Sequence, residues 1–310
     1  MHYRYRPESL CQAPETLSED VLYVVGGLYG NALALDRIEA MAAAEEADGR
    51  RVKLLFNGDF NWFNAEDGLF SEINRRVLDH DAMLGNVEYE LAHPSEGAGC
   101  GCAYPEFVGS EVVARSNRIM ERLQTVASRH SDIQSRLANL ARFRCMIFGG
   151  LKVLVLHGDP ESLAGWGLAY ETFIKGNDDQ LTAWFRATGA DVMVCTHTCL
   201  PLLWQGVVDG SPRQVLNNGS AGMGNLLGDS RGLIVRLGTT EPTEAPVAGL
   251  GVGQAQLSLL PVNFDQGAWL TQFDSLWPSG SDAEQSYRER MVSGTSLSTD
   301  ALYFGTGVLA

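Results

Sequence analysis

The sequence predicts an α/β layered fold, because short apolar segments alternate with helix-like segments along the chain. Residues 21–25 form the first apolar segment, and residues 32–47 follow with an apolar face and a solvated face that carries Glu45 and Glu46. Residues 54–56 form a second apolar segment, which precedes a helix-like segment at 70–80. This alternation of strand and helix is typical of proteins in which helices cover a sheet.

The rest of the chain continues the alternation. Residues 111–143 predict a long helical stretch that breaks into two helices near residues 129–132. The glycine pair at 149–150 predicts a hairpin between strands at 144–148 and 152–156. Further elements are expected in this order: a helix at 178–188, a strand ending at residue 195, a hairpin of 207–210 with 214–216, strands at 232–237 and 256–262, and helices at 268–276 and 283–292. Residues 238–250 are rich in Pro and Thr and predict a linker or a long hairpin loop.

Length and charge restrict the class of protein. A chain of 310 residues can bury a large core and fits one large domain, or a domain with an appendage. The net charge of −15 argues against non-specific binding to DNA, RNA or an anionic membrane. No apolar run approaches the ~18 residues that a membrane span needs. Residues 1–7 precede no apolar stretch, so no signal peptide is expected and we predict a cytoplasmic protein.

The cysteines are expected to be reduced. Six cysteines in a chain without a signal peptide are typical of free thiols in the cytoplasm. Cys100 and Cys102 have one residue between them, which is a weak metal signal. We expect both to be ordinary loop thiols, with a supply of soft ligands to a metal site as the alternative.

Polar residues follow four of the apolar segments. Residues 52–56 precede Asp59, residues 83–84 precede Asn86, residues 153–156 precede His157, and residues 191–195 precede His197. Four buried strands that each deliver one oxygen or nitrogen atom to a common edge predict a metal site. A carboxylate, an amide oxygen and two imidazoles suit zinc, manganese or iron. The alternative is structural: core histidines bonded to the backbone, and an aspartate that caps a turn.

The order of these motifs resembles that of the calcineurin-like metallophosphoesterases. That family carries Asp-x-His, Gly-Asp, Gly-Asn-His-Asp/Glu, His-Gly and Gly-His-x-His. The chain has Gly27-Leu28-Tyr29-Gly30-Asn31, Gly58-Asp59, Gly85-Asn86-Val87-Glu88, His157-Gly158 and Thr196-His197-Thr198-Cys199. Residues 215–222 are similar to the Asn-Pro-Gly-Ser turn of the bacterial members.

The resemblance spans about residues 21–237 and implies the fold. It implies a four-layer α/β/β/α sandwich of two mixed sheets, formed by residues 21–310 after an N-terminal extension at 1–20. A helical insertion at about 106–143 is expected to form a cap over the site. Residues 250–310 are expected to form a C-terminal strand and helix extension.

The resemblance also implies a metal site that has lost half of its ligands. Asp59, Asn86, His157 and His197 match the ligands of one metal ion. The other ion depends on positions that here carry Gly27, Tyr29 and Cys199, and glycine offers no ligand. Tyr29 and Cys199 are remnants of this site: we expect Tyr29 to fill space as a buried aromatic, whereas Cys199 is either a ligand or a core thiol.

Catalytic roles are implied for Asn86 and Glu88. Glu88 matches a position where the family often has an acid, and it either acts in catalysis or orients a neighbouring group. Val87 stands where the family has the histidine that contacts phosphate or protonates the leaving group. Trp62 and Phe63 stand where related phosphatases often carry Asp and Arg, so we expect an apolar mouth.

The function implied is hydrolysis of a phosphomonoester or phosphodiester with one divalent Mn, Fe or Zn ion, a second ion being doubtful. Weak or unusual activity is expected, because the positive charge of a second ion, which would stabilise the transition state, is missing. The expected partner is a small phosphorylated substrate, with no nucleic acid and no membrane, and a homo-oligomer is compatible with the sequence. The alternative is a catalytically inactive protein of the same fold that binds a ligand or a partner.

Overall fold

The computed structural model describes residues 3–95, 97, 99–106 and 108–305, and within them the strands form two sheets. The seven-stranded sheet has, in spatial order, β1 (Glu15–Thr16), β5 (Phe143–Phe148), β6 (Leu151–Leu156), β7 (Val192–Cys195), β9 (Ser211–Asn218), β8 (Pro201–Val208) and β13 (Tyr303–Gly305). The six-stranded sheet has β11 (Ala248–Val252), β12 (Ala255–Val262), β10 (Gly232–Gly238), β2 (Val21–Val25), β3 (Val52–Phe56) and β4 (Asp81–Ala82).

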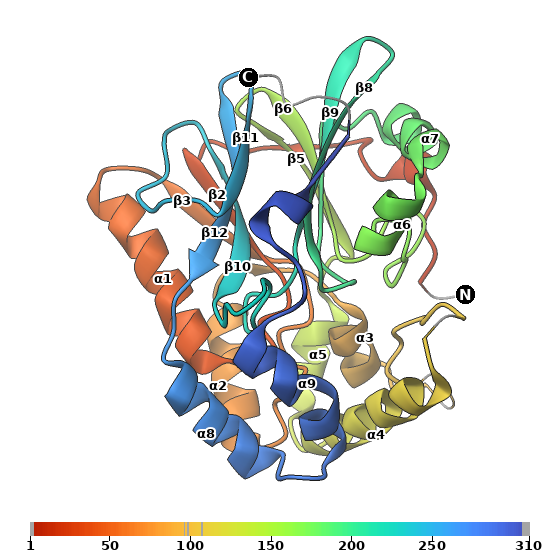
Figure 1. Cartoon of the computed structure of the whole chain (residues 1–310), viewed down its shortest axis with the longest axis vertical. Coiled ribbons are helices and arrows are strands. Elements are labelled where there is room, and N and C mark those ends of the chain that lie inside the picture. The colour runs from red at the N-terminus through yellow and green to blue at the C-terminus, as the bar shows by residue number, and fades with distance from the viewer. Residues whose placement is uncertain (1–2, 96, 98, 107, 306–310) are drawn as a thin grey trace.

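Both sheets are mixed, and helices cover their outer faces (Figure 1). Strands β2, β3 and β4 are parallel, as are β6, β7 and β9, whereas the remaining neighbours include antiparallel hairpins such as β5–β6 and β8–β9. The helices are α1 (Ala32–Ala47), α2 (Asp67–Val77), α3 (Asn86–Ala92), α4 (Ser110–Ala127), α5 (Ser131–Ala138), α6 (Tyr170–Lys175), α7 (Asp178–Thr188), α8 (Gln266–Leu276) and α9 (Asp282–Ser293), with 3-10 turns at Pro7–Ser9 and Thr299–Leu302. The predicted four-layer sandwich of two mixed sheets is confirmed.

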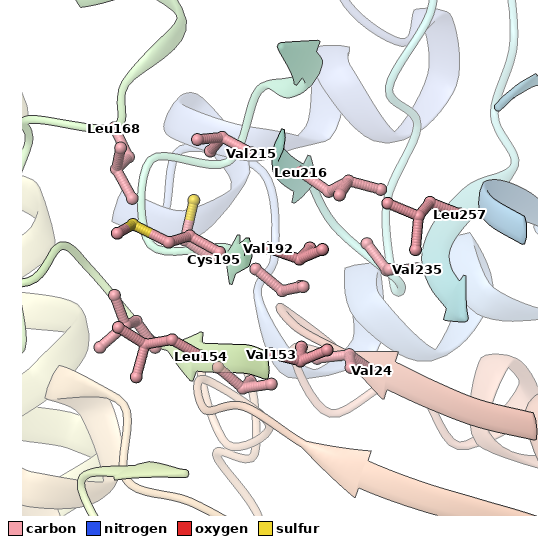
Figure 2. Close-up of a cluster of buried hydrophobic side chains, with 14 of the residues drawn as sticks. Val24, Val153, Leu154, Leu168, Val192, Cys195, Val215, Leu216, Val235 and Leu257 are labelled. Atoms are coloured by element: carbon pink, nitrogen blue, oxygen red, sulfur yellow. The ribbon is translucent and has the colours of Figure 1, made fainter. Parts of the chain in front are cut away.

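The main core lies between the two sheets. Because successive side chains of a strand point to opposite faces, Leu22 and Val24 of β2 face the other sheet, whereas Val21 and Val25 face the helices. Figure 2 shows Val24, Val235 and Leu257 of the six-stranded sheet beside Val153, Val192 and Leu216 of the seven-stranded sheet. This packing fixes the two sheets relative to each other and therefore fixes the strand ends.

Most of the elements predicted from the sequence are present. The helices at 32–47 and 178–188 coincide with α1 and α7, and the hairpin around Gly149-Gly150 is β5–β6. The stretch at 111–143 contains α4 and α5, with the break at residues 128–130. Residues 239–247 connect β10 to β11, and because β12 lies between these two strands in the sheet, they form a connecting loop and not the loop of a hairpin. The N-terminal extension at 1–20 also contributes a strand, because Glu15 and Thr16 pair with β5 at the edge of the sheet; two residues are too few to show a period in the sequence.

One residue on the expected solvated face of α1 is buried. Glu45 has no exposed surface, and its carboxylate accepts hydrogen bonds from Arg236 Nε at 2.7 Å and from the Tyr23 hydroxyl at 3.0 Å. Arg50 also donates to this carboxylate. The prediction is wrong because the partner, Arg236, comes from β10, about which the helix pattern says nothing. A buried carboxylate of this kind is tolerated only when it is paired and hydrogen-bonded.

The expectation that all six cysteines are reduced is wrong for four of them. Disulfides join Cys11 to Cys145 and Cys100 to Cys102, while Cys195 and Cys199 are free. The first pair is 134 residues apart in sequence and is brought together by the pairing of β1 with β5. Disulfides are typical of oxidising compartments, so the cysteines no longer support a cytoplasmic location. Among the described helices, none is long and apolar enough to cross a membrane.

Candidate metal centre

The predicted ligands meet at the carboxyl ends of the parallel strands. Asp59 lies just after β3, His157 follows β6 directly, and His197 lies just after β7. Asn86 is the first residue of α3, which follows β4. Because the two sheets pack face to face, these strand ends bring side chains from both sheets to one point. The structure thus places all four residues together.

The donor atoms form a tight cluster around His157 Nε2. This nitrogen lies 3.0 Å from Asn86 Oδ1, 3.1 Å from His197 Nδ1 and 3.4 Å from Asp59 Oδ1. The ligand atoms of Asp59, His157 and His197 all lie within 4.8 Å of one another, and all three residues are buried. Metal–ligand bonds of about 2.0–2.1 Å in a tetrahedron separate neighbouring ligand atoms by about 3.3 Å. The cluster therefore has the dimensions of a metal site.

Backbone carbonyls fix the tautomers of both histidines. His157 Nδ1 lies 2.9 Å from the Asn57 carbonyl oxygen, and His197 Nε2 lies 3.1 Å from the Cys102 carbonyl oxygen. A carbonyl only accepts, so each of these nitrogens carries hydrogen and donates it. The other nitrogen of each neutral ring then presents a lone pair to the cluster. Two lone pairs, an amide oxygen and a carboxylate facing one another repel unless a proton on His157 Nε2 or a metal ion lies among them.

The pKa values show that Asp59 and His157 stabilise each other's charge, whereas burial keeps His197 neutral. Although burial opposes its charge, the neighbouring Asp59 carboxylate raises the pKa of His157 above its usual value. Burial, followed by the effect of His157, lowers the pKa of His197 to about 4. Burial opposes ionisation of Asp59 as well, yet His157 lowers its pKa. Asp59 is therefore an anion beside a neutral His197, a combination suited to a divalent cation.

Asn86 is oriented in the same way as His197. Its Nδ2 donates to the Cys100 carbonyl oxygen at 2.9 Å, which leaves Oδ1 directed at His157. The loop of Cys100, Gly101 and Cys102 therefore holds two of the candidate ligands through its carbonyl groups. Sequence reasoning treated these cysteines as ordinary loop thiols and missed this role, because it belongs to backbone oxygens.

Glu88 holds the turn that carries Asp59. Its carboxylate accepts hydrogen bonds from the backbone N–H groups of Asp59 at 2.7 Å, Phe60 at 3.0 Å and Gly85 at 3.1 Å. Burial, and then the charge of Asp59, raise the pKa of Glu88 to about 7, while the N–H donors oppose the rise. Glu88 is fully buried and does not line the cavity described below. Its geometry is that of a positioning residue.

The cluster also depends on close approach of the backbone. Asp59 has φ of 56°, a left-handed conformation that costs a non-glycine residue energy and that Glu88 helps to hold. A Cβ atom on Gly85 would lie 2.3 Å from Asp59 Oδ1, and one on Gly58 would lie 2.6 Å from His157 Nδ1. These two motif glycines therefore leave room for the ligands themselves.

A cavity of about 170 Å³ opens onto the cluster. Aromatic residues form much of its wall, namely Tyr29, Trp62, Tyr104, Trp166 and Tyr287; the other lining residues are Asp59, Asn86, Val87, Cys102, His197, Thr198 and Cys199. Trp62 lines it as expected, but Phe63 is buried behind it. None of the described residues at 106–143 lines this cavity, so the expected cap does not form its wall.

Sequence reasoning missed three of the aromatic residues. Tyr104 follows the cysteine loop, Trp166 lies in the loop after His157, and Tyr287 belongs to α9 near the end of the chain. The available signal was the Gly165-Trp166-Gly167 sequence, in which a large ring stands in a glycine-rich loop close behind a candidate ligand. Tyr104 and Tyr287 carry no local signal, because only the tertiary fold brings them to the site.

Solved structures share this architecture. A hypothetical protein from Pyrococcus horikoshii OT3 matches with a TM-score of 0.58 and 12% identity, over 89% of this chain and 99% of that chain. A metallophosphoesterase from Sphaerobacter thermophilus matches with a TM-score of 0.55 and 18% identity, over 90% of this chain and 100% of that chain. The chain has the metallophosphoesterase fold. No protein-family model and no curated protein matches its sequence.

The positions that the sequence resemblance assigns to a second ion carry neutral groups. The Tyr29 hydroxyl lies 2.7 Å from Cys199 Sγ, and that thiol donates to the His197 carbonyl oxygen at 3.3 Å. Burial raises the pKa of both Tyr29 and Cys199, so each keeps its proton. A Cβ atom on Gly27 would lie 3.0 Å from Tyr29 Cζ, so the phenol ring occupies the space beside this glycine.

Proposed function

We propose that the chain is a metal-dependent phosphoesterase that holds one divalent transition-metal ion through Asp59, Asn86, His157 and His197. The observation that carries the proposal is the cluster of electron-rich atoms around His157 Nε2, with both histidine tautomers set by backbone carbonyls. A carboxylate, an amide oxygen and two imidazoles suit Mn, Fe or Zn. The match in fold to a metallophosphoesterase supports the reaction class.

The reaction consumes one water molecule. Its oxygen becomes bonded to phosphorus, the bond from phosphorus to the leaving oxygen breaks, and one proton passes to the leaving group or to solvent. A bound divalent ion supplies Lewis acidity toward a phosphoryl oxygen and makes water more acidic. Asp59, held by Glu88, and the two histidines keep this charge at the strand ends. Small phosphorylated molecules are the substrates that fit.

The residues of the site also restrict its chemistry. Val87 lines the cavity and cannot donate a proton, so the departure of a poor leaving group goes unassisted there. Tyr29 and Cys199 remain protonated and add no charge for a second ion. Without a second ion, one positive charge that would stabilise the transition state is absent, and the loss of such a stabilising group typically costs on the order of 10² to 10³ in rate. The enzyme is therefore weak and favours aryl esters over alkyl esters.

The test combines metal content with turnover. The purified chain is loaded with Mn, Fe or Zn and assayed on an aryl and an alkyl phosphate ester. We expect turnover of the aryl ester by the wild type and by a His93→Ala control, whose histidine is exposed, and none by His157→Ala. A chain that binds metal and hydrolyses no phosphate ester is instead a binding protein, and equal turnover of aryl and alkyl esters would show that another residue supplies the acid.

A further inference from the structure

The first described residues of the chain lie against the loops that surround the candidate metal centre. Residues 3–5, here called the N-terminal strap, pair with residues 161–163, which belong to the loop that follows His157. The Tyr5 N–H donates to a carbonyl oxygen of that loop at 2.8 Å, and the Tyr3 carbonyl oxygen accepts from one of its N–H groups at 2.8 Å. Backbone bonds therefore hold the strap in place, and these bonds do not depend on its side chains.

The loop that receives the strap is itself joined to a support of the metal centre. The carboxylate of Asp159 accepts hydrogen bonds from three N–H groups of this loop, each at 2.9 Å. Trp166 of the same loop donates Nε1 to the Cys102 carbonyl oxygen at 2.9 Å. That oxygen also accepts from His197, so the strap is paired with a loop that contacts the support of a candidate ligand.

The side chain of Tyr3 contacts the helix that carries another candidate ligand. Its ring packs edge to face on Tyr89 of α3, with 4.9 Å between the ring centroids, and its hydroxyl donates to Glu90 Oε1. Glu90 is only 1% exposed, and a buried carboxyl group needs hydrogen-bond partners, of which Tyr3 supplies one. Because α3 begins at Asn86, Tyr3 joins the strap to the helix of this ligand.

The same hydroxyl lies against the backbone of the cysteine loop, residues 100–102. A Cβ atom on Gly101 would lie 2.3 Å from the Tyr3 hydroxyl oxygen and 3.0 Å from Glu90 Cγ, so only a glycine allows this approach. Gly101 also has φ of 66°, a conformation that favours glycine. The other carboxylate oxygen of Glu90 accepts from Ser95 Oγ at 3.1 Å, in the segment that leads into the loop. Tyr3 and Glu90 thus form the surface on which the cysteine loop lies.

The position of the cysteine loop decides how two candidate ligands are oriented. Its carbonyl oxygens accept from Asn86 Nδ2 at 2.9 Å and from His197 Nε2 at 3.1 Å. Asn117 Oδ1 supports the loop at its first N–H group, at 3.1 Å, whereas Tyr3 and Glu90 support its middle residue. A loop that loses one of these supports moves more freely, and its carbonyl groups then hold the ligands less well.

We infer that Tyr3 is a positioning residue of the metal centre, which it supports through Glu90 and the cysteine loop. The inference rests on the metal site of the function proposed above and not on the reaction. Displacement of the N-terminal strap lowers the metal affinity although every ligand is still present. The N-terminal extension is therefore part of the metal centre and not an appendage to the fold.

Two substitutions at Tyr3 test this role. Tyr3→Ala removes both the ring and the hydroxyl, whereas Tyr3→Phe keeps the ring against Tyr89 and removes only the bond to Glu90. Metal affinity is measured by titration of Zn²⁺ against a chelator of known affinity. We expect binding about fivefold weaker in Tyr3→Ala, below the 10- to 100-fold loss that is typical when a group bonded directly to a ligand is removed, and within about twofold of the wild type in Tyr3→Phe.

The matched control is Arg4→Ala, and a spectrum separates positioning from general stabilisation. Arg4 lies in the same strap with an exposed side chain, so this variant should bind Zn²⁺ as the wild type does. The absorption spectrum of bound Co²⁺ depends on the geometry of its ligands. We expect it to change in Tyr3→Ala and to be that of the wild type in Arg4→Ala and Tyr3→Phe. If Tyr3→Ala lowers only the free energy of unfolding, with metal affinity and spectrum unchanged, the inference is wrong.

A double change tests the contact between Tyr3 and the cysteine loop. Gly101→Ala places a Cβ atom against the Tyr3 hydroxyl and should weaken metal binding, and the same change should cost less in a Tyr3→Ala background, where the clash is absent. Equal costs in the two backgrounds would show that Tyr3 does not act through the loop. A wild-type chain that binds no metal removes the metal centre proposed above, whereas equal metal affinity of the wild type and Tyr3→Ala removes this inference alone.

Discussion

The loop closed by the Cys100–Cys102 disulfide holds two candidate metal ligands, and opening it should weaken metal binding. The Cys100 carbonyl oxygen accepts from Asn86 Nδ2 at 2.9 Å, and the Cys102 carbonyl oxygen accepts from His197 Nε2 at 3.1 Å. The perturbation is the double change Cys100→Ser and Cys102→Ser. It keeps both carbonyl groups but removes the covalent bond that fixes their positions.

The magnitude follows from the role of these carbonyls. Groups that orient metal ligands typically contribute 10- to 100-fold to metal affinity, and here two ligands depend on one loop. Because the carbonyls stay in the chain and lose only their fixed placement, we expect about tenfold weaker binding, which corresponds to about 1.4 kcal/mol. His157 should be affected less, since its orienting carbonyl belongs to Asn57.

The assay is a competition titration of the metal against a chelator of known affinity. The matched control is Cys11→Ser with Cys145→Ser, which removes the disulfide between the N-terminal segment and β5. In that control a reducing agent should lower the metal affinity about tenfold, and in the Cys100→Ser and Cys102→Ser variant it should have no effect. If the Cys100→Ser and Cys102→Ser variant binds the metal as tightly as the wild type does, the idea that the loop orients the ligands is refuted.

Three further outcomes are expected. Tyr29→Phe should leave the metal content unaltered in elemental analysis, because the neutral phenol of Tyr29 is not a ligand. Loss of metal from this variant would show that Tyr29 is a ligand. Glu45→Gln should lower the free energy of unfolding by about 3 kcal/mol in denaturant titrations, because it leaves Arg236 buried without its counter-charge. Although burial opposes the shift, Arg236 lowers the pKa of Glu45 in the folded state. The stabilisation is therefore present above the pKa of Glu45 in the unfolded chain and is lost as the pH falls through the lower pKa in the folded protein. The free energy of unfolding of Glu45→Gln should depend less on acid pH than that of the wild type, and an unchanged dependence would exclude the Glu45–Arg236 pair as its source. Removal of the Cys11–Cys145 disulfide should lower the free energy of unfolding by about 2–4 kcal/mol, and a decrease below about 0.5 kcal/mol would show that this disulfide does not stabilise the fold.

The sequence was sufficient for features that depend on local pattern and motif order. Strand β2 and helix α1 were predicted to the residue, because their apolar runs end at a glycine turn and at Asp48-Gly49. Asp59 and His157 were found as candidates because each follows a buried strand. The two-sheet arrangement came from the order of the motifs and not from composition.

Features that depend on distant partners were not predictable. Glu45 pairs with Arg236, 191 residues away, so a helix pattern could not show that it is buried. Tyr287 reaches the cavity from α9, and no spacing in the sequence connects it to the ligands. The Cys102 residue acts through its backbone carbonyl oxygen, which accepts from His197, and the identity of a side chain gives no sign of such a role.

The number of metal ions held per chain tests the metal centre most directly. The purified protein is dialysed against Mn, Fe or Zn, and bound metal is measured by elemental analysis for the wild type and for His157→Ala. We expect close to one tightly bound ion per wild-type chain and almost none in the variant, which lacks the atom at the middle of the cluster. Two ions per chain would contradict the neutral roles of Tyr29 and Cys199, and metal retained by His157→Ala would contradict the site itself.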